Sequence, residues 1–166
     1  MNFLGRTTRT VGALGFRRFA RSYATESTGA SDKLRLSFAV PHETLYDNAE
    51  VQQVNLSSTA GDMGILANHL ATIQQLKPGV VEVVENSTTT KKFFVSGGFA
   101  TVNPDSSLDI NAVEAFPLEH FSIEAIRANL AEAQRISASS ATEADRAAAR
   151  VEVEVLEALQ TALGKS

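Results

Sequence analysis

The sequence predicts a β + α fold: an N-terminal antiparallel β-sandwich followed by a C-terminal antiparallel α-helical hairpin. Residues 34–40 alternate strictly between apolar and polar side chains, which is typical of a half-buried strand. Short apolar runs separated by turn residues then continue for about eighty residues, as in a sandwich or barrel. At Phe121 the apolar spacing changes from two to about 3.6. We therefore predict a sandwich domain at 33–117 and a hairpin domain at 118–166.

The segment before the first strand differs in composition from the rest of the chain. Residues 1–23 contain five arginines and no acidic residue, with hydroxyl and apolar residues between them. This composition is typical of a mitochondrial transit peptide, although a basic tail that binds nucleic acid is an alternative. Residues 24–32 are small and polar, and we expect a flexible lead-in there.

The charge balance indicates protein partners. The chain has 15 basic and 19 acidic side chains, and without residues 1–23 the basic ones fall to ten. A domain with that excess of acid is a poor candidate for binding nucleic acid. The absence of cysteine excludes disulfides, thiolate catalysis and cysteine-ligated zinc.

Within the predicted sandwich, the first strand ends at Pro41, and "TLYDNAE" leads to a second strand around Val51, Val54 and Leu56. The spacing change in that second strand is typical of a β-bulge. "VVEVVE" is a strand after the turn "KPG", "NSTTTKK" is a hairpin tip, and "FFVSGGFATV" is a further hairpin interrupted by glycines. "LDINAVEA" closes the domain with alternating apolar residues.

Two helices follow. Ser122 is placed as an N-cap, with Phe121 and Ile126 as a hydrophobic staple and an apolar stripe from Ile123 to Ala133. After the break "SASSA", Thr142 and Asp145 resemble a capping box, and Val151, Val155, Leu159 and Ala162 share one side of the second helix. Two short helices bury little apolar surface alone, so the hairpin should pack on the sandwich or on a partner.

The stretch "GDMGILANHLA", residues 61–71, is the best candidate for a functional site. Gly61 and Gly64 predict a tight turn that displays Asp62 and Met63, while Ile65 and Leu66 return to the core and Asn68 and His69 bond local backbone. The stretch lacks the lysine and hydroxyl residue that end a P-loop. His69, like His42 and His120, has no nucleophile motif or set of metal ligands around it. We predict no catalytic, cofactor-binding or metal-binding residue.

Three segments in order resemble a known family. "GDMGILANH", "LKPGVVEVV" and "FFVSGGFATV" are similar to the central-stalk subunit of F-type ATP synthase, called delta in mitochondria and epsilon in bacteria. The resemblance covers roughly residues 33–165. It implies a β-sandwich and a helical hairpin in a rotor component without catalysis of its own. The transit-peptide composition favours the mitochondrial form.

The resemblance also implies partners and a place in the cell. The family couples proton flow to ATP synthesis by joining the membrane-embedded c-ring to subunit gamma, beside a small subunit named epsilon in mitochondria. This implies a peripheral protein on the matrix side of the mitochondrial inner membrane. Gly61, Asp62, Met63, Gly64 and His69 match the loop that approaches the c-ring. Ala67, Asn68 and Ala71 depart from the family pattern around the histidine.

The first predicted helix carries a changed form of a second family motif. Bacterial members have I-D-x-x-R-A there, a motif linked to ATP binding, and this chain has Ile123, Glu124, Arg127 and Ala128. Because glutamate replaces aspartate, the carboxylate is displaced by one methylene, and we expect no physiologically useful ATP binding. The alternative functions are a nucleotide-binding regulatory sandwich and, less favoured, a His-dependent hydrolase or metalloenzyme.

Overall fold

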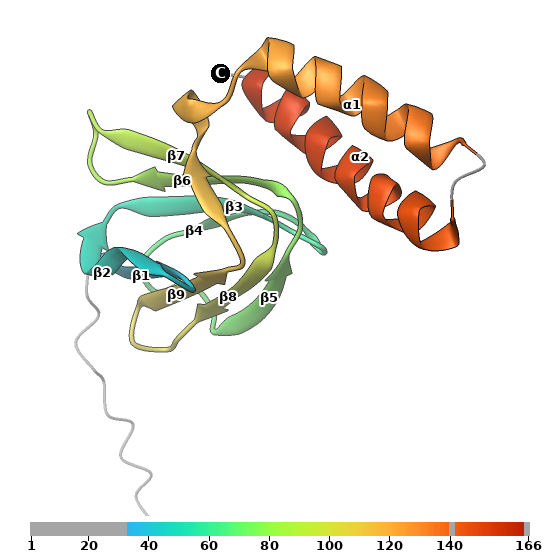
Figure 1. The fold of residues 1–166 in the computed structure, drawn as a ribbon. Helices are drawn as coiled ribbons and strands as arrows, with labels where there is room; N and C mark the ends of the chain where they lie inside the picture. The colour runs from blue at the N-terminus through green and yellow to red at the C-terminus, as the bar shows by residue number, and fades with distance from the viewer. Residues whose placement is uncertain (1–32, 140–141, 165–166) are drawn as a thin grey trace, which may run out of the picture.

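The computed structural model describes residues 33–139 and 142–164, and the predicted transit peptide and lead-in lie outside them. The strands form a curled sheet that encloses a core, and the two helices lie side by side along one flank of it (Figure 1). The predicted β-sandwich followed by a helical hairpin is confirmed.

Ten strands lie within residues 33–139: β1 (Leu34–Val40), β2 (Glu43–Val51), β3 (Gln53–Ser58), β4 (Gly61–Ile65), β5 (Thr72–Leu76), β6 (Gly79–Val84), β7 (Thr90–Val95), β8 (Gly98–Val102), β9 (Ser107–Ala112) and β10 (Ala115–Pro117). Their order is β10-β7-β6-β3-β5-β8-β9-β1-β2, and β4 pairs with β3 outside this path. All these pairings are antiparallel except β1 with β9, which is parallel and departs from the all-antiparallel expectation.

The alternation predicted for the first strand fills the core. Leu34, Leu36 and Phe38 are fully buried, and the side chains between them are only partly buried. Across the sheet, Phe38 meets the ring of Phe93 edge to face, with 5.6 Å between ring centroids. This contact joins β1 to β7, so the core is continuous through the sandwich.

The second strand was predicted wrongly in its extent. "TLYDNAE" belongs to β2, which ends at Val51, and β3 begins at Gln53, so the predicted strand spans two. The register irregularities lie at Leu36–Phe38 and Phe38–Ala39, where β1 meets β2. The changed spacing at Val51 and Val54 therefore marks a bend between two strands.

The prediction for "FFVSGGFATV" was also wrong, because β7 and β8 do not form a hairpin. β7 pairs with β6 and β10, whereas β8 pairs with β5 and β9. Gly97 and Gly98, both at positive φ, lead the chain from β7 to β8, which pairs with different strands. A Cβ on Gly98 would lie 2.3 Å from the carbonyl oxygen of Asn111, so the crossing requires glycine there.

The tip of the β6–β7 hairpin is shorter than predicted, because Thr90, Lys91 and Lys92 already belong to β7. Beside this tip, the Tyr46 hydroxyl donates to Glu85 at 2.8 Å and the Lys91 amine lies 2.9 Å from the same carboxylate. These two donors lower the pKa of Glu85, the lysine more strongly. The cluster ties β2 to the β6–β7 hairpin across the curled sheet.

The helices are α1 (Ile123–Ser137) and α2 (Glu143–Gly164), preceded by the 3₁₀ turn η1 (Leu118–His120). The backbone N–H of Ala125 donates to the Ser122 hydroxyl, which confirms the predicted N-cap. Likewise, Asp145 N–H donates to Thr142 Oγ1 at 3.2 Å.

The hairpin packs on the sandwich through a small apolar cluster at one end. Its buried members are Phe94, Leu118, Ile126 and Leu159. Phe121 packs against them, as the predicted staple requires. Val151, which was predicted to share the apolar side of α2, is 62% exposed. The far half of the hairpin therefore extends beyond its contact with the sandwich (Figure 1).

Candidate functional site

The glycines of the candidate stretch do not form the predicted tight turn. Gly61–Ile65 is the strand β4, and the turn lies before it at Thr59 and Ala60. The Ser58 hydroxyl donates to the Gly61 carbonyl oxygen at 2.8 Å and accepts from Ala60 N–H, so Ser58 shapes this turn. The turn lies three residues earlier than Gly61 and Gly64 predict, because a buried serine at a strand end is a weaker turn signal than glycine.

Asp62 is displayed, as predicted, although from a strand. Its side chain is 80% exposed. The Ser57 hydroxyl donates to Asp62 Oδ1 at 2.8 Å, and the Lys77 amine lies 4.0 Å from the same oxygen. The carboxylate is thus held by the Ser57 hydroxyl and weakly paired with the Lys77 amine.

His69 lies in a different place from Asp62. It is in the loop after β4, where its backbone N–H donates to Leu66 O at 3.3 Å and its Nδ1 lies 2.9 Å from Leu70 O. The Asn68 N–H donates to the buried Ser106 hydroxyl, which links this loop to the β8–β9 turn. The histidine therefore bonds local backbone, as predicted, while Asn68 bonds a residue 38 positions away.

Apolar side chains surround this loop on the surface, and sequence reasoning missed them. Leu66, predicted to return to the core, is 51% exposed, and Leu70 and Ile73 are 83% and 70% exposed. In β5 the half-buried positions are Thr72 and Gln74, so the usual polar alternation is inverted. These three large apolar side chains are exposed close to His69 in the sequence, which their polarity alone does not predict.

The altered motif at the start of α1 lines a pocket of about 580 Å³ together with Gln160 and Leu163 of α2. Glu124 accepts a hydrogen bond from the Ser122 hydroxyl at 2.9 Å. Its own backbone N–H and this hydroxyl hold the pKa of Glu124 below its usual value. Ile123 is half-buried, whereas Arg127 and Ala128 are exposed.

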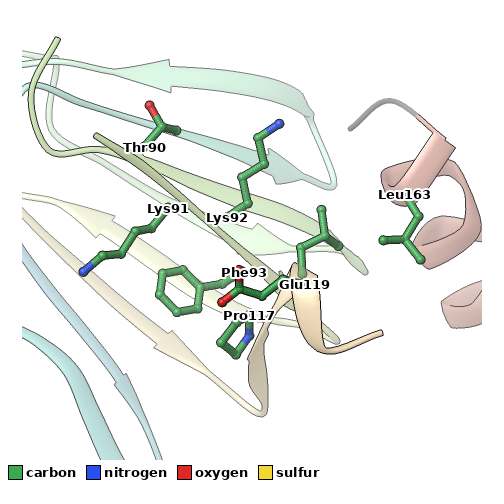
Figure 2. A pocket seen from close by; sticks show the side chains of 8 residues that line it. Thr90, Lys91, Lys92, Phe93, Pro117, Glu119 and Leu163 are labelled. Atoms are coloured by element: carbon green, nitrogen blue, oxygen red, sulfur yellow. The ribbon is translucent and has the colours of Figure 1, made fainter. Parts of the chain in front are cut away.

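A second hollow of about 420 Å³ lies where β7, η1 and the end of α2 meet. Figure 2 shows Lys91 and Lys92 pointing in different directions and Leu163 approaching from the helix. Lys91 and Lys92 are both engaged, by Glu85 and by Glu82 respectively. This hollow therefore does not offer two converging cations to an anionic ligand.

No group of three or more potential metal ligands occurs among residues 33–139 and 142–164. Neither of the two helices in those ranges is long and apolar enough to cross a membrane.

Comparison with known proteins agrees with the resemblance in the sequence. The family model of the ATP synthase delta/epsilon chain β-sandwich domain matches residues 33–117. A model of the C-terminal domain of the fungal epsilon subunit of F1F0-ATP synthase matches residues 121–161. Together the two models match most of the described chain.

Curated relatives and solved structures extend this match. Mitochondrial ATP synthase subunit delta of Yarrowia lipolytica is 60% identical over 84% of each chain, and that of Saccharomyces cerevisiae is 59% identical over 86% of this chain and 88% of its own. A chain in the Euglena gracilis mitochondrial ATP synthase, in a structure of OSCP, F1 and the c-ring, superimposes with a TM-score of 0.79 at 32% identity, covering 96% of this chain and 99% of that one. This chain belongs to the delta/epsilon family of ATP synthase subunits.

Proposed function

We propose that this chain is the delta subunit of the central stalk of a mitochondrial ATP synthase, and that it joins the c-ring to subunit gamma. It couples proton translocation to ATP synthesis mechanically and catalyses no reaction itself. The observation that carries the proposal is the 60% identity to a mitochondrial delta subunit along 84% of the chain. The Euglena structure, which contains F1 and the c-ring, supports a place in such an assembly.

The fold suits a part that transmits torque. Transmission without slip requires a domain that does not deform, and the sandwich has one continuous apolar core with fully buried residues from β1, β3, β6 and β9. The small subunit epsilon and gamma are the further partners in this proposal. The protein then sits on the matrix side of the inner membrane, peripherally, after residues 1–23 have served as its transit peptide.

For the contact with the c-ring we propose Gly61, Asp62, Met63, Gly64 and His69. The exposed carboxylate of Asp62 and the exposed Leu66 and Leu70 beside His69 support a surface that offers both charge and apolar area. The two parts lie along β4 and in the loop after it, so they form two contact points.

Affinity capture tests the proposal. A tagged full-length chain expressed in yeast mitochondria should recover gamma, the small epsilon subunit and the c-ring subunit, identified by mass spectrometry. Recovery of the chain alone would contradict the stalk assignment. In the captured complex, Asp62→Lys should reduce ATP-driven proton pumping. Pumping equal to wild type would show that the charge of Asp62 does not contribute to the proposed contact.

A further inference from the structure

The curled sheet has three strands with an unpaired edge within residues 33–139: β2, β10 and β4 each pair with one strand only. An open edge presents backbone N–H and C=O groups that can pair with another chain. Proteins protect such edges with bulges, charges, proline or short length. How each edge is protected therefore indicates which of them a partner covers.

Two of the edges are protected. β2 carries register irregularities against β1, a positive φ at Asn48, and the acidic residues Glu43, Asp47 and Glu50. β10 has three residues and ends in Pro117, which cannot donate to a neighbour. Neither edge offers a regular ladder to an incoming strand.

The edge of β4 keeps an unbroken register, although Gly61 at its start also has a positive φ and Asp62 places one charge on it. Its five residues pair with β3 in consecutive register, without a shift, and β4 contains no proline or lysine. Because every second residue of an antiparallel strand directs its backbone groups away from its partner, β4 presents a row of donors and acceptors on its outer side.

The side chains of β4 select what can pair there. Both contacts of Asp62 involve Oδ1, so Oδ2 has no partner among the described residues. Gly64 has no side chain, and a Cβ there would lie 3.2 Å from the amide groups of Asn55 and Gln53. An incoming strand therefore meets one exposed carboxylate and, beside it, bare backbone. A second copy of this edge would bring a second carboxylate toward Asp62.

A groove of about 450 Å³ continues from this edge over the outer face of the sheet toward the hairpin. Its lining includes Asp62, Met63 and Gly64 of β4, together with Leu118 of η1 and Ala162 of α2. The Glu82 carboxylate in this groove already accepts from Asn55 at 2.8 Å and lies 3.8 Å from the Lys92 amine. Both oxygens of Glu82 thus have a neighbour, whereas Oδ2 of Asp62 has none among the described residues.

We propose that the edge of β4 is completed by an extended segment of another polypeptide, which adds as a strand and places a lysine against Asp62. Backbone pairing provides the binding and the basic side chain provides the specificity. The inference rests on the proposed function only for the source of the segment, a subunit of the same complex.

Hydrogen exchange and cross-linking on the captured complex test this proposal. The amides of residues 61–65 should exchange roughly tenfold more slowly in the complex than in the free chain. Carbodiimide activates the Asp62 carboxylate, which then forms an amide with a lysine amine close by. Mass spectrometry should identify a lysine of another subunit, and Asp62→Asn should remove that product.

Charge reversal provides the matched control. Asp62→Lys should abolish the slow exchange at 61–65, whereas Glu43→Lys, the same charge change on the protected β2 edge, should leave it intact. A complex that contains the stalk subunits but shows unprotected β4 amides overturns this inference alone. A cross-link to a second copy of this chain also overturns it, and failure to recover any ATP synthase subunit contradicts the proposed function instead.

Discussion

The sandwich and the helical hairpin are stabilised in different ways. The sandwich has a core of 18 buried apolar residues in one cluster, drawn from strands throughout the sheet. The hairpin shares with the sandwich a cluster of four buried residues, two of which, Phe94 and Leu118, come from outside the helices. The comparison shows that the sandwich supplies its own stability, whereas the hairpin depends on contact with the sandwich at one end.

The largest effect should come from breaking the sandwich core. Phe38→Ala removes a fully buried ring that contacts Phe93, so the free energy of unfolding should fall by about 3–5 kcal/mol. Urea denaturation followed by circular dichroism measures this, and the hairpin should not stay folded once the sandwich has unfolded. Phe99→Ala, at a phenylalanine that is 55% exposed, is the matched control and should change stability much less. Equal losses in the two variants would contradict the central place of Phe38.

An intermediate effect should come from breaking the hairpin's contact. Leu159→Ala removes a buried side chain of α2 from the cluster at Phe94. The free energy of opening of the hairpin should fall by about 2–4 kcal/mol. Hydrogen exchange should accelerate in α1 and α2, while the amides of β1 and β9 keep their protection. Val151→Ala, at an exposed position of the same helix, serves as the control. If β1 and β9 lost protection together with the helices, the two regions would be one cooperative unit.

The smallest effect should come from the cap of α1. Ser122→Ala removes the acceptor for the Ala125 N–H and should destabilise the hairpin by about 1 kcal/mol. Ser122→Asn keeps an acceptor at the cap and should restore most of that stability. Faster exchange in the first turn of α1 for the alanine variant, but not for the asparagine variant, would sharpen the comparison. Identical exchange in both would show that the docked cluster alone holds the helix start.

The sequence also determined parts of the candidate site, although less completely. Asp62 was expected on the surface and lies there, because burying a carboxylate without a close cation partner is costly. The exposed Leu66, Leu70 and Ile73 could not be predicted, since apolar residues are normally assigned to the core. Their position follows from the loop that Asn68 and Ser106 hold together, a contact across 38 residues.

Local signals in the sequence specify the order of the two regions, the first strand and both helix starts, because periodicity and caps depend on residues a few positions apart. Which strands pair, in contrast, depends on contacts between distant parts of the chain. The parallel pairing of β1 with β9 joins residues about seventy positions apart, and no local signal encodes it. The need for glycine at position 98 is likewise a tertiary effect. The backbone of β9 lies too close to Gly98 for any side chain to fit there.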